Sequence, residues 1–289
     1  MKKIYPVLVL VVLFACSLLL HHFSEKKPVV NTAGKLAVSF IDVGQGDSAF
    51  IEFPGGKCAL IDAGEAENAR SVVSYLKERQ CKKIDYLICT HPHSDHIGGM
   101  VQVLEAVEVG AVYMPRVSHT SGTFEKLLLA IDSKGLTVHG VKAGDSIAVE
   151  QDVTLTVVAP SSDTYEELND YSLVLHLAYG ETSFLFTGDA EKLSEQEMLK
   201  SGLPLEADVL KVGHHGSSTS SHKKFLEAVA PTWAVISCDG NNEYGHPHKE
   251  VVNRIEKLGI EIYRTDRDGT VMAISDGQTV TFRTSEGET

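Results

Sequence analysis

The segment of residues 90–100, THPHSDHIGGM, constrains this chain most strongly, because it places three histidines and an aspartate within six positions. The apolar run before it, residues 84–89, is predicted to be a buried strand. If the strand's alternation continues into the loop, His91 and His93 point the same way, and the following turn directs Asp95 and His96 to a second point nearby. Imidazole and carboxylate groups together suit zinc, manganese or iron, so the segment predicts two divalent metal ions rather than a solvated polar loop.

Five further motifs lie at predicted turns. They are FIDVGQGDS at residues 40–48, LIDAG at 60–64, TGD at 187–189, KVGHHGS at 211–217 and YGHPH at 244–248. With the histidine segment, and in this order from about Leu36 to the C-terminus, they resemble the metallo-β-lactamase superfamily of hydrolases and, more narrowly, its ComEC-like branch. The resemblance implies an α/β fold, the four-layer αββα sandwich, in which the loops carrying the motifs meet along one edge of two sheets.

The resemblance also implies which residues bind the two metal ions. The implied set is His91, His93 and Asp189 for the first ion, and Asp95, His96, Asp189 and a later histidine for the second. Asp189 is the candidate for the carboxylate shared by both ions, and a helix N-cap is the alternative reading. Two such ions lower the proton affinity of water and polarise a phosphoryl or acyl oxygen.

Four later histidines compete for the remaining roles. His214 and His215 both follow an apolar run, and we choose His215 as the ligand, which leaves His214 for proton transfer or substrate binding. His246 and His248 are interpreted as substrate contacts or proton donors, with His246 as the replacement ligand; surface histidines in a Gly/Pro turn are the alternative. We therefore assign catalytic roles to Asp95, His214 and His246.

One departure from the wider superfamily concerns the first ion. Many members supply a third histidine just before a strand where this chain has NDYSLV at residues 169–174, a sequence typical of the ComEC-like branch. Asn169 and Asp170 are therefore candidates for contacts to ligand or substrate, and an oxygen from Asp170 would favour manganese over zinc. The departure makes β-lactam hydrolysis less favoured.

A second group of residues is predicted to support the ligands. Asp62 matches the superfamily's first acidic position, which orients a metal ligand. Asp42 and Asp47 flank two glycines and support the same loop, unless they only stabilise a turn. Ser217 fits loop capping and substrate contact better than nucleophilic catalysis.

The N-terminus reads as an export signal or membrane anchor. Two lysines precede the apolar residues 4–20, which predicts this segment at residues 1–23, a linker at 24–35 and the hydrolase domain at 36–289. Lipidation of Cys16 is the alternative to an uncleaved anchor. Either way the hydrolase is expected outside the cytoplasm, attached to the cytoplasmic membrane or secreted.

The remaining cysteines, Cys58, Cys81, Cys89 and Cys238, are scattered singly among mostly apolar neighbours. They indicate neither a CxxC pair nor a disulfide framework. We interpret them as small buried apolar residues, with a chance disulfide as the alternative.

Short β runs alternate with amphipathic helices along the rest of the chain. The periodicity predicts strands at residues 36–43, 48–53, 58–61, 84–89, 111–114, 136–141, 146–149, 153–158, 171–179, 182–187, 207–212, 233–237, 260–264, 271–275 and 279–283, and helices at 65–80, 100–107, 123–133, 190–201, 221–229 and 249–258. Each half of the chain thus contains both strands and helices, a pattern that favours a layered α/β protein.

Three functions are compatible with these features. The ComEC-like resemblance implies a phosphodiesterase, namely a nuclease that acts on single-stranded DNA and is linked to DNA uptake and to a separate competence-type channel protein. The formal net charge of −13 disfavours sequence-independent binding to nucleic acid and favours a small substrate, such as a phosphocholine ester, lactone or β-lactam. The third hypothesis is a metal-stabilised subunit that presents DNA without cleaving it.

Overall fold

The computed structural model describes residues 30–286, of which residues 32–286 lie in one compact unit that begins at Thr32. The predicted signal or anchor and Cys16 lie outside these residues. Among the helices of the described part, none is long and apolar enough to cross a membrane.

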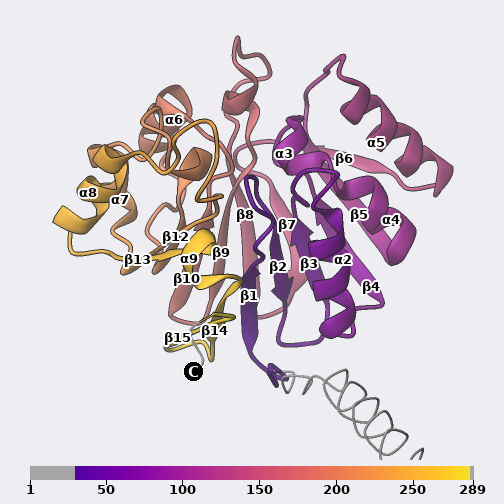
Figure 1. Ribbon diagram of the computed structural model, residues 1–289, viewed down its shortest axis with the longest axis horizontal. Helices are drawn as coiled ribbons and strands as arrows, with labels where there is room; N and C mark the ends of the chain where they lie inside the picture. Colours follow the sequence, from indigo (N-terminus) through magenta and orange to yellow (C-terminus); the bar gives the residue numbers. More distant parts are fainter. Residues whose placement is uncertain (1–29, 287–289) are drawn as a thin grey trace, which may run out of the picture. The chain divides into compact units, whose positions relative to one another are not determined.

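Two mixed sheets form the centre of the unit (Figure 1). The first has the order β15-β14-β1-β2-β3-β4-β5-β6. Its strands are β1 (Leu36–Phe40), β2 (Ala49–Glu52), β3 (Cys58–Ile61), β4 (Lys83–Ile88), β5 (Glu108–Pro115), β6 (Val138–Val141), β14 (Val271–Ser275) and β15 (Val280–Thr284). The second has the order β13-β12-β11-β10-β9-β8-β7. Its strands are β7 (Ser146–Glu150), β8 (Val153–Ala159), β9 (Val174–Tyr179), β10 (Thr182–Phe186), β11 (Val209–Lys211), β12 (Trp233–Ile236) and β13 (Glu261–Arg264).

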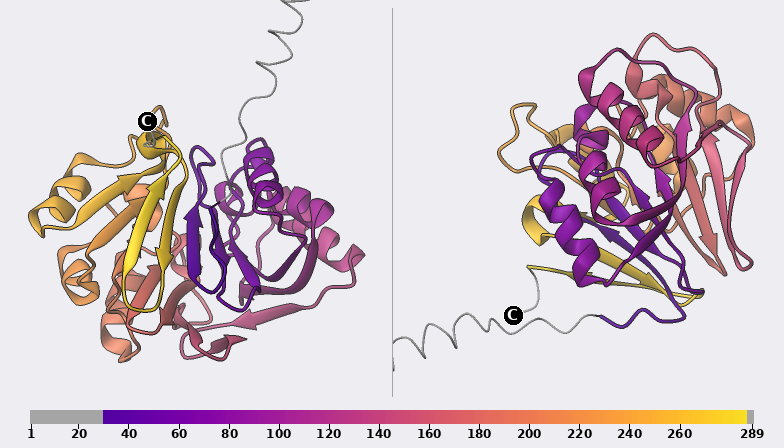
Figure 2. Two further views of the ribbon diagram at one scale, coloured as in Figure 1. Left: turned by 90° about the horizontal axis from the view of Figure 1, so that it is seen from below. Right: turned by 90° about the vertical axis from the view of Figure 1, so that its right-hand side faces the viewer.

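Helices cover the outer face of each sheet (Figures 1 and 2). The first sheet carries α2 (Ala69–Glu78), α3 (Ser94–Ile97), α4 (Met100–Ala106) and α5 (Gly122–Ser133), and the second carries α6 (Lys192–Ser201), α7 (Lys223–Val229) and α8 (Lys249–Lys257). Each helix buries a stripe at helical spacing, such as Val251 and Ile255 on α8. The resulting order of helix, sheet, sheet and helix confirms the predicted four-layer α/β sandwich.

Three apolar clusters stabilise these layers. The largest lies between the sheets, where Phe40 and Phe186 pack with ring centroids 6.0 Å apart. A second joins the first sheet to its helices, and a third joins the second sheet to its own. Because central strands such as β1 and β3 are buried on both faces, their sequences read as largely continuous apolar runs rather than as alternation.

The structure corrects several predicted boundaries. Residues 171–173 were predicted as strand, but a short 3-10 helix, η1 (Leu168–Tyr171), precedes β9, which starts at Val174. Helix α6 starts at Lys192 instead of residue 190. The one-turn helices α3 and α9 (Thr265–Asp268) were not predicted, because four residues are too few to show helical periodicity.

The four described cysteines are all free. Cys58, Cys89 and Cys238 are buried, as predicted, whereas Cys81 is partly exposed.

Parallel pairing brings distant loops to one edge of each sheet. In the first sheet β3 and β4 are parallel, so the residues after them leave at the same edge. In the second sheet β10, β11 and β12 are parallel in the same way. Asp62 and the histidine segment follow the first pair of strands, and Asp189 and His215 follow β10 and β11.

Candidate metal centre

The loop after β4 is held by one buried carboxylate. Asp62 is fully buried and accepts hydrogen bonds from the backbone N–H of Thr90 (2.8 Å) and the Thr90 hydroxyl (2.6 Å). His96 Nδ1 lies 2.8 Å from the same carboxylate. Because Nδ1 is engaged, the other ring nitrogen of His96, Nε2, is directed away from Asp62 and is free to bind a ligand.

The loop after β11 uses an unusual backbone. His214 and His215 both have left-handed conformations, with φ of 48° and 52°, in the short 3-10 segment η2 (Gly213–Gly216). Non-glycine residues rarely adopt this conformation, so the surrounding contacts must hold it. His215 turns inward, where its Nδ1 lies 3.0 Å from the Ser237 carbonyl oxygen and 3.3 Å from Asp47 Oδ1.

The two loops and Asp189 converge on a cluster of four residues: Asp95, His96, Asp189 and His215. Asp189 Oδ1 lies 3.2 Å from His96 Nε2 and 3.5 Å from His215 Nε2. Asp95 Oδ2 lies 3.2 Å from His215 Nε2 and 3.8 Å from His96 Nε2. Only Asp95 is appreciably exposed, at 25% of its side chain.

The spacing of this four-residue cluster fits a metal ion. Four ligands about 2.0–2.1 Å from a zinc ion stand at tetrahedral corners about 3.3–3.4 Å apart, close to the observed spacing. His96 Nε2, His215 Nε2 and Asp189 Oδ1 are all buried and have no hydrogen-bond partner among the described residues. Buried polar atoms without a partner are costly, and a cation between them would satisfy all three.

A cluster of three residues, His91, His93 and Asp189, lies on the other side of the same carboxylate. His91 Nε2 is 2.9 Å from His93 Nδ1 and 3.8 Å from Asp189 Oδ2. His214 Nε2 approaches Asp189 Oδ2 as well, also at 3.8 Å. Each oxygen of Asp189 therefore faces a different cluster, which is the arrangement that a carboxylate bridging two ions requires.

The electrostatics of the centre favour positive charge beside Asp189. Burial opposes the charged form of His96 and His215, but the nearby carboxylates, Asp189 above all, outweigh it and raise the pKa of both imidazoles well above the ordinary value. Burial raises the pKa of Asp189, but His96 and His215 outweigh it and hold that pKa well below the ordinary value. In contrast, burial and the neighbouring His96 lower the pKa of His91, which keeps it neutral, the form in which imidazole binds a metal.

Four of the predicted supporting residues lie outside both clusters. Asp42 accepts from the backbone N–H of Gly44 (3.1 Å) and stabilises a turn. Asp170 faces the start of α6, where it accepts from the N–H of Ser194 (3.4 Å), so it supplies no oxygen to the three-residue cluster. Asn169 donates to Glu191 (3.0 Å), and Ser217 hydrogen-bonds within its own loop to Thr219.

The position of the missing third histidine is occupied by hydroxyls. Ser172 Oγ lies 3.4 Å from His91 Nδ1 and accepts from the backbone N–H of Asp189 (3.1 Å). Thr90 Oγ1 approaches the same imidazole nitrogen at 3.1 Å. These contacts orient His91 but add no ligand to the first ion.

His246 and His248 line the approach to His214. The ring of His246 lies 5.3 Å from that of His214, and the ring of His248 lies 5.0 Å from that of His246. Burial, and then the charge of His214, lower the pKa of His246 to about 4, so this side chain is neutral at pH 7 and does not suit the predicted role of proton donor. His248 Nδ1 accepts from the N–H of Ser218 (2.9 Å), which ties the two histidine-bearing loops together.

The structure gives three residues supporting contacts that the sequence did not define. Asp47 was weighed against simple turn chemistry, yet it contacts His215 and forms a buried ion pair with Lys211 (2.9 Å). Glu191 lies 3.1 Å from His214 Nδ1 and was read only as part of a helix start. The residue types carry no signal for these contacts, because each joins elements that are distant in the sequence.

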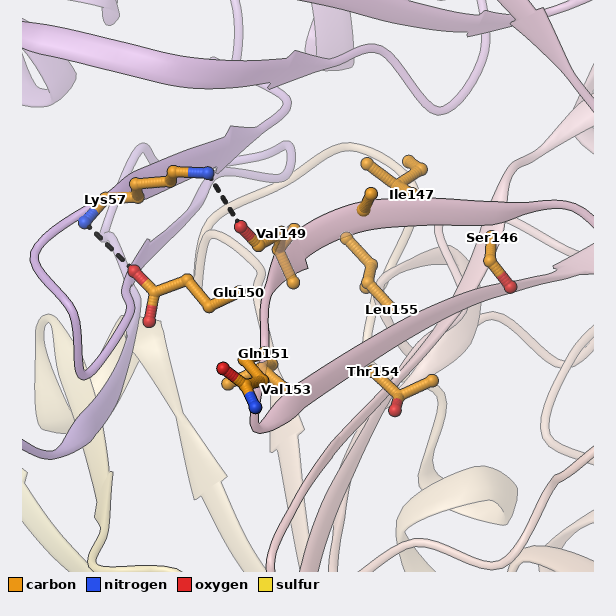
Figure 3. A pocket seen from close by; sticks show the side chains of 10 residues that line it. Lys57, Ser146, Ile147, Val149, Glu150, Gln151, Val153, Thr154 and Leu155 are labelled. Atoms are coloured by element: carbon orange, nitrogen blue, oxygen red, sulfur yellow. Dashed lines mark hydrogen bonds between the residues drawn. The ribbon is translucent and has the colours of Figure 1, made fainter.

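One surface pocket lies away from this centre. A surface pocket of about 500 Å³ lies along the β7–β8 hairpin and is lined by residues such as Lys57, Ile147 and Leu155 (Figure 3). None of the predicted site residues lines it, and the Lys57 amine is engaged with the Val149 carbonyl oxygen (2.8 Å). The metal centre is recognised by its ligand geometry instead.

Comparison with known proteins identifies one family and several relatives that match most of the chain. The model of the Metallo-beta-lactamase superfamily matches residues 41–240. The chain is 34% identical over 261 residues to ComE operon protein 3 of Bacillus subtilis, covering 84% of this chain and 33% of the relative. It is 30% identical over 256 residues to competence protein ComA of Neisseria gonorrhoeae, covering 88% of this chain and 34% of the relative. The chain thus spans about a third of the length of these relatives.

Among solved structures, the metallo hydrolase Igni18 of Ignicoccus hospitalis superposes with a TM-score of 0.53 at 14% identity, over 82% of this chain and 98% of that chain. At this identity the likeness shows a shared fold.

Proposed function

Because the chain belongs to the metallo-β-lactamase superfamily, we propose that it is a metal-dependent hydrolase that cleaves phosphodiesters outside the cytoplasm. The observation that carries this proposal is the division of the Asp189 oxygens between two ligand clusters. When bound there, two divalent cations lower the pKa of water and neutralise the charge that develops on a phosphoryl group.

The protein's own residues then orient the substrate and move protons. His214 is the most exposed histidine that reaches Asp189, with 22% of its side chain exposed, and its Nδ1 is held by Glu191 and Thr219 at 3.1 Å each. Its Nε2 therefore faces the space beside Asp189, where it can donate a hydrogen bond to the substrate or a proton to the leaving oxygen. Neutral His246, packed beside it, can form a hydrogen bond to the substrate.

Two observations favour phosphodiesters over other substrates. His91, His93 and Asp189 would hold the first ion without a third histidine, which would leave more room for oxygen atoms of a substrate than a fully histidine-bound ion does. One relative is named a competence protein, which supports single-stranded DNA as a substrate. Manganese, which accepts oxygen ligands readily, or zinc would serve as the metal.

We also propose where the hydrolase is located and which protein it works with. Residues 1–23 attach the hydrolase to the cytoplasmic membrane, as an anchor or a lipoprotein, or direct its secretion. A competence-type channel protein is the proposed partner, because one relative is named a competence protein.

The test compares wild type with Asp189→Ala on labelled single-stranded DNA, bis-p-nitrophenyl phosphate and nitrocefin, each with manganese or zinc. We expect wild type to cleave the two phosphodiesters, and Asp189→Ala to lose both cleavage and bound metal. Asp152→Ala, in the exposed β7–β8 turn, serves as the control that keeps both. Cleavage of nitrocefin alone would contradict the proposal and support a small-molecule hydrolase. Metal-dependent DNA binding without cleavage would support a DNA-presenting subunit.

A further inference from the structure

Two cysteine thiols lie side by side at the edge of the first sheet opposite the metal centre. Cys58 Sγ and Cys81 Sγ are 3.5 Å apart. Cys58 is the first residue of β3, four positions before Asp62, and Cys81 lies between α2 and β4. Both thiols also donate to the Lys83 carbonyl oxygen, at 2.9 and 3.3 Å, so both point at the same spot.

The other two cysteines of the described chain have no such neighbour. Cys89 Sγ is fully buried and contacts Met100 Sδ at 3.9 Å. Cys238 Sγ is also buried and contacts Asp266 at 3.4 Å. The proximity of Cys58 and Cys81 is therefore specific to this pair.

The two sides of the pair differ in exposure and in their contacts. The Cys58 side is fixed: Lys57 is tied to the β7–β8 hairpin through its backbone N–H to Glu150 (3.3 Å) and its amine to Val149 (2.8 Å), as Figure 3 shows. The Cys81 side is a partly exposed turn after α2, where Gln80 has a left-handed φ of 58°. A disulfide requires sulfur atoms about 2.05 Å apart, so the turn must close by about 1.5 Å.

We propose that Cys58 and Cys81 are a redox pair that forms an intramolecular disulfide when the protein meets a disulfide oxidant, such as oxidised glutathione or an oxidised thiol–disulfide oxidoreductase. The Cys81 thiolate attacks one sulfur of the oxidant, which breaks the oxidant's S–S bond and releases one thiolate. The Cys58 thiolate then attacks Cys81 Sγ, which forms the new bond and releases the second thiol. The two cysteines lose two protons and two electrons, and the oxidant gains them.

The hydrogen bond between the thiols supports this order of events. The contact between the two thiols raises the pKa of Cys58 and lowers that of Cys81. Cys81 is also the more accessible of the two. It is therefore the thiol that an oxidant reaches first.

The bond would brace the fold without altering the metal centre. It would close a covalent loop around α2, between the starts of two adjacent parallel strands. The metal ligands leave from the opposite ends of those strands. Such a bond persists only in an oxidising compartment, but the proximity of the thiols holds whether or not the proposed hydrolase activity is correct.

The experiment treats the reduced full-length protein with oxidised glutathione, alkylates the remaining thiols and digests with trypsin. Cleavage after Lys57 and Arg70, and after Arg79 and Lys82, places each cysteine in its own peptide, residues 58–70 and 80–82. We expect the two peptides to be joined, with a combined mass about 2 Da below their sum. Recovery of both as separate alkylated peptides, or of glutathione on Cys81 alone, would overturn the proposal.

Matched variants separate a specific pair from random oxidation. Cys58→Ser should abolish the joined peptides, and Cys89→Ser, a buried thiol elsewhere, should keep them. On wild type alone, oxidation should raise the Tm by about 5–10 °C, since the bond closes a loop of roughly 23 residues. An unchanged Tm would contradict the bracing role, and equal metal content before and after oxidation is expected.

Discussion

The two loops that bring histidines to the centre are built in different ways. The loop of residues 90–96 has ordinary backbone conformations, ends in helix α3, and is held by Asp62 from the adjacent strand. The loop of residues 213–222 contains two consecutive left-handed histidines and is held by three carboxylates from other elements, Asp47, Glu191 and Glu195. The first loop is determined largely by its own sequence, and the second by its neighbours.

This difference indicates which loop is more sensitive to the loss of a supporting contact. A loop whose residues favour their own conformation tolerates loss of one contact, whereas strained residues relax when a supporting contact is lost. We therefore expect the second loop to control how well His215 meets the ions, even though it supplies fewer ligands.

The largest expected effect comes from removing one ligand of each loop from the same cluster. His96→Ala and His215→Ala should each lower phosphodiester turnover by at least about a thousandfold, because the ion they share supplies several kcal/mol of transition-state stabilisation. Each should also lose about one bound metal ion by elemental analysis. If only one variant loses metal, the two loops do not serve a common ion.

The next effect is on stability and its dependence on pH. Glu195 is almost fully buried and accepts from the backbone N–H of Ser221 and from His222, and burial raises its pKa to about 7. A carboxyl whose folded pKa is raised stabilises the fold below its unfolded pKa, about 4.5, and loses that contribution as the pH rises through about 7.

Glu195→Gln removes this titration. As the pH rises from 4 to 8, wild type loses this contribution and the variant does not. The free energy of unfolding of the variant minus that of wild type should therefore increase by up to about 3 kcal/mol. Denaturant unfolding at several pH values measures this difference, with exposed Glu250→Gln as the control. If the difference in free energy of unfolding between the variant and wild type does not change with pH, Glu195 does not support the second loop in this way.

A smaller effect distinguishes the carboxylates behind the two inward histidines. Asp62→Asn and Asp47→Asn should each weaken metal affinity by about 10–100-fold, as loss of a group that orients a ligand commonly does. The larger loss is expected for Asp62, which fixes both Thr90 and His96, whereas His215 keeps the Ser237 carbonyl oxygen. Competitive titration with a chelating dye measures both affinities, and the reverse order would contradict the comparison.

The smallest effect concerns Glu191, a positioning residue behind His214. Glu191→Gln keeps an oxygen near His214 Nδ1 but removes its charge, so kcat should fall by about threefold while metal content stays unchanged. The kcat–pH profile should shift as well, which a purely structural role would not produce. Glu256→Gln, on the exposed side of α8, provides the control.

The same difference explains which parts of the molecule could be predicted from sequence. The strands, most helices and the first loop follow from apolar runs and from ligand residues that are close together in the chain. Asp189 stood out because the TGD motif resembles the superfamily's third acidic position, with a helix N-cap as the alternative reading. The structure places its carboxylate between the two histidine clusters, while α6 starts with Glu191 as the residue before its first turn.

What sequence could not provide was contact across the two sheets. Asp170 was the natural replacement for the missing histidine, yet η1 turns it toward α6. Asp47 meets His215 because Gly46, with a φ of 134°, lets its loop pack so closely on residues 90–96 that a Cβ there would collide with the Asp95 carbonyl oxygen. Neither packing event leaves a periodic pattern in the chain.

The placement of Asp189 also determines when during synthesis the centre can first exist. The histidine segment ends at residue 96 and belongs to one sheet, but the aspartate that both clusters share emerges ninety-three residues later, from the other sheet. A nascent or truncated chain therefore carries the histidines without the carboxylate that unites them. The complete set of metal ligands therefore comes together only after both sheets have docked, so any metal-dependent hydrolysis depends on completion of the fold.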